Sequence, residues 1–195
     1  MALIDEELLE PLARLARFMT GIKYIPKKTP ITLVDLGCGT KARFYFYSKK
    51  KGVKLKNYVG LDPLIKIAKP PKARFIKKAL QHKIPLPQNS AECVVGFAFI
   101  EHVKYPKDIL KEIIRILKKD GVAIITTPTP KAKRLLEFLA FKSKLLSTRE
   151  IDEHENYFDK KQLMQILKKE KGNVKILHKY FEFGLNNLLI LRKTK

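Results

Sequence analysis

The sequence predicts an α/β fold, a Rossmann-like doubly wound sheet that is mostly parallel and carries an antiparallel hairpin at its C-terminal edge. Residues 31–36 form an apolar, β-branched run before two glycines, which is typical of a buried strand and a tight turn. Strand-like and helix-like patterns then alternate, which indicates parallel strands with helices on both faces. Two final strand-like runs, 174–183 and 188–192, have no helix between them and predict the antiparallel edge.

The first half of the chain supplies a leading helix and the first two strands. Residues 3–19 are amphipathic and predict a helix, in which Pro11 either causes a break or begins a fresh first turn. After strand 31–36 we expect a helix over 41–50 and a second strand over 58–61. The apolar side of the leading helix consists of Leu8, Leu12, Leu15, Phe18 and Met19.

The second half contains the clearest helix. Residues 106–119 begin with Pro106, which suits a first helical turn, and Asp120-Gly121 is a stop signal. The apolar run 122–128 predicts the fifth strand, and 159–170 predicts the last helix. The apolar face of helix 106–119 consists of Ile109, Leu110, Ile113, Ile114 and Leu117.

Length and composition indicate one soluble domain over 1–195. A chain of 195 residues with 45% hydrophobic content buries a full core, and no run of eighteen apolar residues predicts a membrane span. The acidic N-terminus lacks the basic-then-apolar order of a signal peptide, so we expect a cytoplasmic protein, monomeric or homodimeric. Cys38 and Cys93 are then expected to be reduced thiols.

The net charge of +22 raises the question of a nucleic-acid partner. Most of the 41 basic residues are lysines spread along the chain, whereas phosphate and base recognition favours arginine. Solvated lysines at helix ends and in loops explain the composition equally well, and lysine-rich surfaces also occur in hyperthermophile proteins. Charge alone therefore leaves both interpretations open.

The turn after the first strand predicts a cofactor site. Gly37 and Gly39 let the backbone approach a ligand closely, and Asp62 ends the second strand, where a carboxylate binds ribose hydroxyls. The spacing also satisfies the dinucleotide fingerprint G-x-G-x-x-G/A, through Ala42. Asp35 distinguishes the ligands, because its carboxylate repels a pyrophosphate and attracts the sulfonium and ammonium groups of S-adenosylmethionine. Lys41 weakens that contrast, because its charge can neutralise a phosphate. A turn that binds no ligand is the third interpretation, beside S-adenosylmethionine and a dinucleotide.

Several motifs in order resemble the class I S-adenosylmethionine-dependent methyltransferases, specifically the type 11 group that includes ubiquinone-pathway O-methyltransferases. The resemblance covers roughly residues 30–193. Residues 34–40 resemble the first motif and 60–62 the second, while 84–95 resemble the segment LPFPDNSFDVV. Residues 99–103 resemble xxxEHV, and 108–121 resemble ExxRVLKPGG. The resemblance implies a methyltransferase fold, with S-adenosylmethionine as cofactor.

The resemblance also implies a set of cofactor contacts. The sequence departs from the family pattern at two places. Lys41 stands where the first motif often has its third glycine, and neither Ala79 nor Leu80 is the acid that usually binds the adenine amine. Gln81 or a backbone carbonyl is the expected substitute. The implied cofactor residues are Asp35, Gly37, Cys38, Gly39, Asp62, Pro63, Leu80, Gln81, Phe97 and His102.

Two segments are expected to cover the cofactor and acceptor pockets. The resemblance implies that the helix within 1–25 lies over the cofactor; the alternative is a helix that only packs on the sheet. Residues 129–156 form an insertion whose part 131–146 is basic and apolar around most of its circumference. We interpret this insertion as a lid, with a dimer contact or a membrane-surface helix as alternatives.

The chemistry requires aligned reactants and, for an oxygen or carbon acceptor, a group that takes a proton. His102 and His154 are the candidate catalytic bases, although His102 can instead bond to backbone near the cofactor. No essential metal is predicted, because Ala98 stands where some ubiquinone-pathway relatives have the first acid of a metal-binding run. Candidate substrate residues are Glu101, Thr127, Pro128, His154 and Tyr157.

The sequence therefore favours methyl transfer to a small molecule, with oxygen as the expected acceptor atom. The Asn/Asp-Pro-Pro-Tyr/Phe tetrapeptide of many amine methyltransferases is absent after the fourth strand, where Phe97-Ala98-Phe99-Ile100 stands. An RNA (tRNA or rRNA) methyltransferase of the same fold is the first alternative. A non-catalytic protein that binds S-adenosylmethionine is the second.

Overall fold

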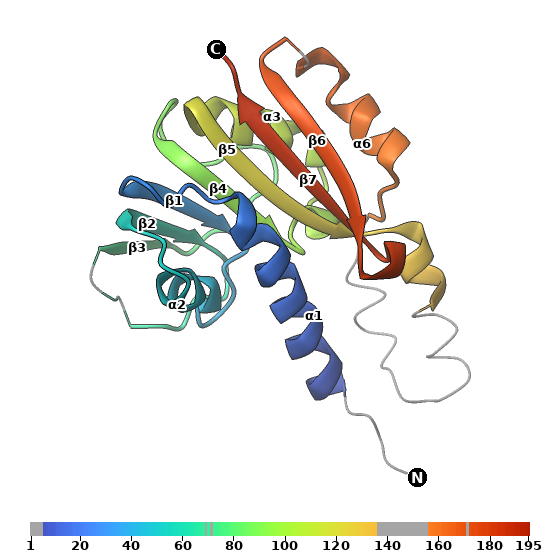
Figure 1. Ribbon diagram of the computed structural model, residues 1–195, viewed down its shortest axis with the longest axis horizontal. Helices are drawn as coiled ribbons and strands as arrows, with labels where there is room; N and C mark the ends of the chain where they lie inside the picture. The colour runs from blue at the N-terminus through green and yellow to red at the C-terminus, as the bar shows by residue number, and fades with distance from the viewer. Residues whose placement is uncertain (1–5, 69, 71, 136–155, 171) are drawn as a thin grey trace.

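The computed structural model describes residues 6–68, 70, 72–135, 156–170 and 172–195. One seven-stranded sheet organises the chain, in the order β3-β2-β1-β4-β5-β7-β6 (Figure 1). Neighbours from β3 to β5 are parallel, and β7 runs antiparallel to both β5 and β6. The predicted fold class is confirmed. The strands are β1 (Ile31–Leu36), β2 (Leu55–Leu61), β3 (Ala73–Ile76), β4 (Ala91–Phe97), β5 (Leu117–Pro128), β6 (Val174–Phe181) and β7 (Asn186–Lys193).

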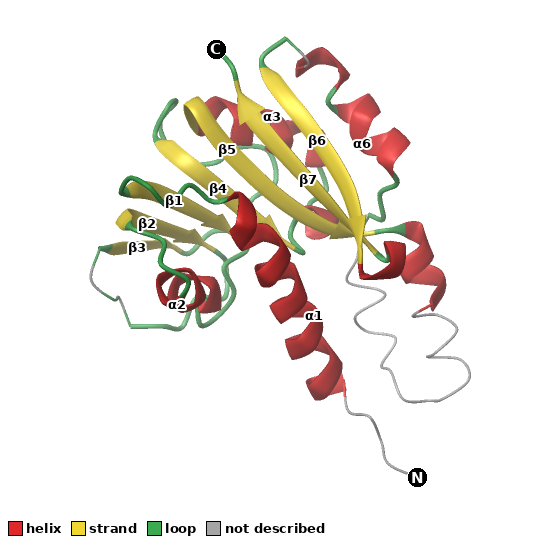
Figure 2. Ribbon diagram, viewed as in Figure 1, coloured by secondary structure: helices red, strands yellow, loops and turns green. Residues whose placement is uncertain are grey.

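Helices cover both faces of this sheet, which makes it doubly wound (Figure 2). Helices α1 (Glu6–Gly21) and α2 (Arg43–Lys50) contribute Phe18, Phe44 and Tyr45 to the hydrophobic cluster on one face. Helices α3 (Pro106–Ile116) and α6 (Lys160–Ile166) pack in a second cluster on the other face. Strands β1, β4 and β5 contribute alternate side chains to both clusters, as expected for central strands of a parallel sheet.

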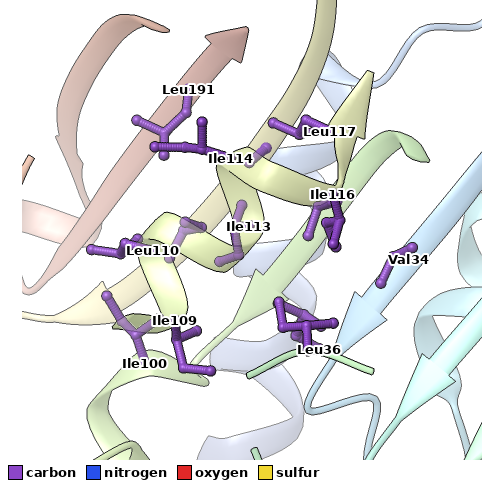
Figure 3. Packing of buried hydrophobic residues seen from close by; sticks show 14 of the residues in the cluster. Val34, Leu36, Ile100, Ile109, Leu110, Ile113, Ile114, Ile116, Leu117 and Leu191 are labelled. Carbon is purple, nitrogen blue, oxygen red and sulfur yellow. The ribbon is translucent and has the colours of Figure 1, made fainter. Parts of the chain in front are cut away.

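Helix α3 illustrates why the second face is stable (Figure 3). Its apolar residues recur at helical spacing, and Ile109, Leu110 and Ile113 are almost fully buried. Pro106 occupies the first turn, where its missing N–H costs no hydrogen bond. Truncation of one such isoleucine to alanine in a core of this kind costs about 2–5 kcal/mol.

The predicted boundary between this helix and the fifth strand is wrong. The helix ends at Ile116, and β5 already begins at Leu117. The register explains the difference: Ala91 pairs with Leu117, but Cys93 pairs with Val122, so β5 bulges between these two pairs. Asp120 lies in this bulge with a left-handed backbone (φ 62°), so the residues interpreted as a helix stop belong to an irregular strand.

Other elements begin or end near their predicted bounds. Pro11 lies inside a continuous α1, and the helix expected over 41–50 begins at Arg43, after Ala42 in a left-handed conformation. The helix expected over 159–170 is α6 followed by a 3-10 turn, and a capping box between Asp159 and Gln162 starts it. Residues 130–135 are helical, whereas the rest of the predicted helix 131–146 lies outside the described residues. None of the helices described here is long and apolar enough to cross a bilayer.

Candidate active site

A cavity of about 680 Å³ lies at the carboxyl ends of β1, β4 and β5, the edge where open α/β sheets bind ligands. Helix α1 forms one wall, and its amino-terminal part extends beyond the sheet (Figure 1). Residues 130–135 and the turn between β6 and β7 also contribute. The residues that bound it include Glu10, Arg14, Arg17, Phe18, Asp35, Gly37, Cys38, Gly39, Lys41, Arg43, Phe97, Ala98, Glu101, His102, Pro128, Leu135, Glu182 and Asn186.

The glycine turn after β1 exposes backbone to this cavity. Gly37 and Gly39 both have positive φ (69° and 72°), a conformation that other residues adopt only with strain. The Gly37 N–H donates to the Leu61 carbonyl at 2.8 Å, which fixes the turn against β2. A Cβ at Gly39 would have no atom within 4 Å, so open space faces this glycine. The turn can therefore accept a ligand against its backbone.

Asp35 is a buried acid beside that turn. It is 2% exposed, lines the cavity, and accepts a hydrogen bond from the Tyr58 hydroxyl. The pKa of Asp35 is raised to about 7, chiefly by burial. The hydrogen bond from Tyr58 opposes this shift, and the negative charge of Asp62 adds to it. A cationic ligand would favour the ionised form, whereas a pyrophosphate would oppose it. The acid therefore suits S-adenosylmethionine, and the arginines of the cavity offer charge for its carboxylate.

Asp62 acts on the turn rather than on the cavity wall. Its Oδ2 accepts from the Gly39 N–H at 2.9 Å, and its Oδ1 accepts from the Leu64 N–H at 2.7 Å. Asp62 is absent from the cavity lining, as are Pro63, Leu80 and Gln81. Leu80 is buried in the core, and the Gln81 side-chain oxygen accepts from the Lys104 N–H at 2.8 Å. The structure thus does not bring these four cofactor candidates to the cavity.

Cys38 lines the cavity but does not suit a nucleophile. Burial raises the pKa of its thiol, and the negative charges of Asp35 and Asp62 raise it further. Both Cys38 and Cys93 are free thiols in the structure. A protonated thiol at Cys38 is a small apolar contact for a ligand.

Glu101 is the second buried acid of the cavity. It lies in the 3-10 turn Ile100–His102 after β4, is 0% exposed, and neither carboxylate oxygen has a hydrogen-bond partner of standard geometry. The pKa of Glu101 is raised to about 7, because burial outweighs the opposing effects of His102, Arg17 and the Thr127 hydroxyl. Thr127 is itself buried without a partner of standard geometry. Buried polar groups are normally bonded, so the Glu101 carboxyl, which lines the cavity, points to a ligand.

The remaining sequence candidates are divided between the cavity and its surroundings. His102 is exposed and lines the cavity together with Phe97 and Pro128, whereas Thr127 and Tyr157 do not line it. Tyr157 instead lies under the Lys133 ammonium, 5.4 Å from its ring centre. His154 and most of the insertion 129–156 lie outside the described residues.

Sequence reasoning missed the polar face of α1. The Arg14 and Arg17 guanidinium groups contact the Glu10 carboxylate at 2.7 and 2.9 Å, and all three residues line the cavity. Arg17 lowers the pKa of both Glu101 and Glu182, so its charge acts inside the pocket. The signal was present, because these residues share the polar side of an amphipathic helix, but only packing shows what that side faces. Within the described ranges, no group of three metal-ligating side chains lies together.

Comparisons with known proteins show the family of this chain and its fold. A family model described as a methyltransferase domain matches residues 4–172. A search of curated proteins finds no match. An S-adenosylmethionine dependent methyltransferase from Mesorhizobium loti has the same fold, with a TM-score of 0.68, 16% identity, and coverage of 95% of this chain and 100% of that chain.

Two further solved structures share the fold. A SAM-dependent methyltransferase from Thermotoga maritima has a TM-score of 0.65 and 21% identity, covering 96% of this chain and 92% of that chain. The plantazolicin methyltransferase BpumL, solved with SAH, has a TM-score of 0.67 and 15% identity. The match covers 94% of this chain and 84% of that chain. The expected cofactor, S-adenosylmethionine, is confirmed. The chain therefore belongs to the methyltransferase-domain family and is a class I S-adenosylmethionine-dependent methyltransferase.

Proposed function

We propose that this enzyme methylates a hydroxyl oxygen of a small molecule in the cytoplasm. The observation that carries the proposal is the cavity itself: α1 covers it, and its volume of about 680 Å³ falls in the range of small-molecule sites. BpumL, a fold neighbour, was solved with a desmethylPZN analog and SAH, which supports a small acceptor. A hydroxyl must lose its proton on methylation, and the cavity contains proton-accepting groups in Glu101 and His102.

The cavity residues divide into two roles in this proposal. Asp35 and the backbone of Gly37 and Gly39 hold the cofactor, with Asp62 fixing the Gly39 N–H. When bound, S-adenosylmethionine supplies an electrophilic methyl group on a positively charged sulfur. Glu101 and Pro128, on the neighbouring strand ends, face the acceptor. Enclosure by α1 excludes water and aligns the two reactants, which lowers the entropic part of the barrier.

The direct test is labelling of metabolite extracts with methyl-tritiated S-adenosylmethionine. The unmutated enzyme should transfer label to a small, extractable compound whose label is retained as a methyl ether. Asp62→Ala, which releases the Gly39 N–H, should transfer little, whereas Asp108→Ala, an exposed acid paired with His82, should label normally. Label found only in nucleic acid or protein would contradict a small acceptor, and label on nitrogen would contradict oxygen.

Methylation of RNA is the second candidate, and the net charge of +22 favours it. An RNA acceptor must place one nucleotide in the cavity and bind the rest on the lysine-rich surface. Affinity for tRNA that survives moderate salt would support this candidate. Affinity that falls steeply with salt, without methyl transfer, would indicate only the attraction of a basic protein for polyanions.

A further inference from the structure

The carboxyl of Glu101, which has no hydrogen-bond partner of standard geometry, is the feature of the cavity that the fold itself does not explain. The residue is fully buried in a turn whose backbone is fixed: the Glu101 carbonyl accepts from the Asn156 N–H at 3.1 Å. The Asn156 side chain donates to the Val103 carbonyl at 2.9 Å, which holds the same turn. The backbone that carries the side chain is therefore fixed, yet neither carboxylate oxygen has a hydrogen-bond partner of standard geometry.

A buried carboxyl without partners destabilises the fold, because its lost hydration is not replaced. Such a group is retained where a ligand supplies the missing hydrogen bond. Glu101 lines the same cavity as the glycine turn, so a ligand there can reach it. Because a carboxylate only accepts, the ligand group must donate a hydrogen.

The charges that face Glu101 come from four elements. Arg17 of α1 and His102 of the same turn lower the pKa of Glu101, and so does the hydroxyl of Thr127 on β5. Asp35, at the end of β1, and Glu182, in the turn after β6, are the acids that share the cavity. No cation forms an ion pair with Glu101 among the described residues, so its carboxylate remains available to a proton donor.

We propose that Glu101 is the catalytic base, and that the acceptor presents a hydroxyl to its carboxylate. This inference rests on the proposed function. The acceptor O–H bond breaks and its proton passes to Glu101, while the oxygen forms a bond to the methyl carbon and the S–C bond breaks toward sulfur. The positive charge of the sulfonium and the negative charge of the carboxylate both disappear, so the products are a methyl ether, neutral S-adenosylhomocysteine and protonated Glu101.

This assignment differs from the one that the sequence favours, in which His102 takes the proton. His102 is exposed to solvent, whereas Glu101 is fully buried at the wall of the cavity. Acceptors without a donor hydrogen, such as thioethers and tertiary amines, would leave the Glu101 charge unpaired. The enzyme should therefore reject them.

The test measures protons released when the cofactor binds, which requires no knowledge of the acceptor. Calorimetric titrations at pH 7, in two buffers of different ionisation enthalpy, compare S-adenosylmethionine with S-adenosylhomocysteine. The two ligands differ by the methyl group and the sulfonium charge. If Glu101 lies near the transferred methyl group, that charge ionises it, and S-adenosylmethionine should release up to about half a proton more than S-adenosylhomocysteine.

The variants decide which residue releases the proton. Glu101→Gln should abolish the difference between the ligands, whereas His102→Gln should retain it. Asp35→Asn should lower proton release for both ligands, because both carry the same ammonium group. Part of the difference in proton release between the two ligands should remain in this variant. Thermal unfolding of each variant verifies that it is folded.

Two outcomes would overturn the inference while leaving the proposed function intact. One is cofactor binding without any difference between the two ligands, and the other is a difference that survives in Glu101→Gln. A difference lost only in His102→Gln would assign the base to His102. Absence of S-adenosylmethionine binding would instead overturn the proposed function, and the inference with it.

Discussion

Asp35 lies near the end of β1 and Glu101 in the turn that follows the neighbouring strand β4, and the environments of these two acids differ. Both are buried, both line the cavity, and burial raises the pKa of each to about 7. Asp35 accepts a hydrogen bond from Tyr58, and the backbone beside it is fixed by β2 and Asp62. Glu101 has no such partner of standard geometry. The side of the cavity that we assign to the cofactor is thus internally bonded, whereas the side that we assign to the acceptor has an acid whose hydrogen bonds the fold does not supply.

This difference matches the tasks of the two sides. A cofactor site binds the same molecule in every catalytic cycle, so hydrogen bonds within the fold can preorganise it. A base must exchange its proton in each turnover, and a permanent hydrogen-bond donor would hold the carboxylate in one state. Substitutions at Glu101, Tyr58 and Asp35 each remove one half of this contrast.

The largest expected effect is on turnover. If Glu101 is the base, Glu101→Gln should lower kcat about 10²–10⁴-fold, the usual contribution of a positioned base, and Glu101→Asp should retain part of it. The measurement is S-adenosylhomocysteine formation with the acceptor found by labelling. The affinity for S-adenosylmethionine should also fall, because the sulfonium loses the carboxylate that it ionises on binding. Equal kcat in the enzyme and Glu101→Gln would remove the contrast altogether.

The next effect is on stability. Because burial raises the folded-state pKa of Glu101 from 4.5 to about 7, the carboxyl contributes no penalty below pH 4.5, and stability is lost as the pH rises toward 7. Glu101→Gln removes this loss, so it should be more stable than the unmutated chain by roughly 3 kcal/mol at pH 8. Denaturant unfolding at pH 5 and pH 8 measures the gain. A variant that is less stable at pH 8 would show that Glu101 is already satisfied.

Removal of the hydrogen-bond donor to Asp35 should instead lower the stability of the fold. Tyr58→Phe removes the donor and leaves a buried carboxyl without its hydrogen bond, which should cost about 1–3 kcal/mol. Tyr180→Phe, at an exposed position on β6, is the matched control and should have little effect. Unfolding in urea at pH 8 compares the two variants. Equal stabilities would mean that the Tyr58 bond does not organise the cofactor side.

The smallest effect concerns pH and cofactor affinity. Since Asp35 has a pKa of about 7 and a bound cation favours its ionised form, S-adenosylmethionine should bind more tightly as the pH rises from 6 to 8. Below pH 7 the dissociation constant should change by up to about tenfold per pH unit for this group. Asp35→Asn should weaken this dependence in fluorescence titrations, and the part that Glu101 contributes should remain. A flat profile for the unmutated enzyme would contradict the raised pKa.

Local pattern predicted most of the fold. The apolar run of β1, the amphipathic face of α3 and the final hairpin are determined largely by residues close in sequence, and their positions agree with the structure. The start of β5 was missed, because Lys118 to Gly121 have the composition of a turn and only pairing with β4 makes them part of a bulged strand. Local residues do not encode that register.

The site divides in the same way. Gly37, Gly39 and Asp35 are recognisable because a tight turn with an adjacent acid is a local pattern. The cavity-facing side of α1, with Arg14 and Arg17, depends on how a distant helix packs. The lack of a partner at Glu101 is likewise a tertiary property, since burial, β5 and α1 together create it. Sequence placed Glu101 near the acceptor but assigned the proton to histidines.

The most direct measurement is isothermal calorimetry of S-adenosylmethionine binding to the unmutated chain and to Asp62→Ala. Asp62 holds the Gly39 N–H and the Leu64 N–H, so its loss should loosen the glycine turn. We predict one binding site in the unmutated chain and an affinity lower by on the order of 10²-fold in Asp62→Ala, as expected when two hydrogen bonds to a charged group are lost. Absence of binding to the unmutated chain, or equal affinity in both, would contradict a cofactor site at this turn.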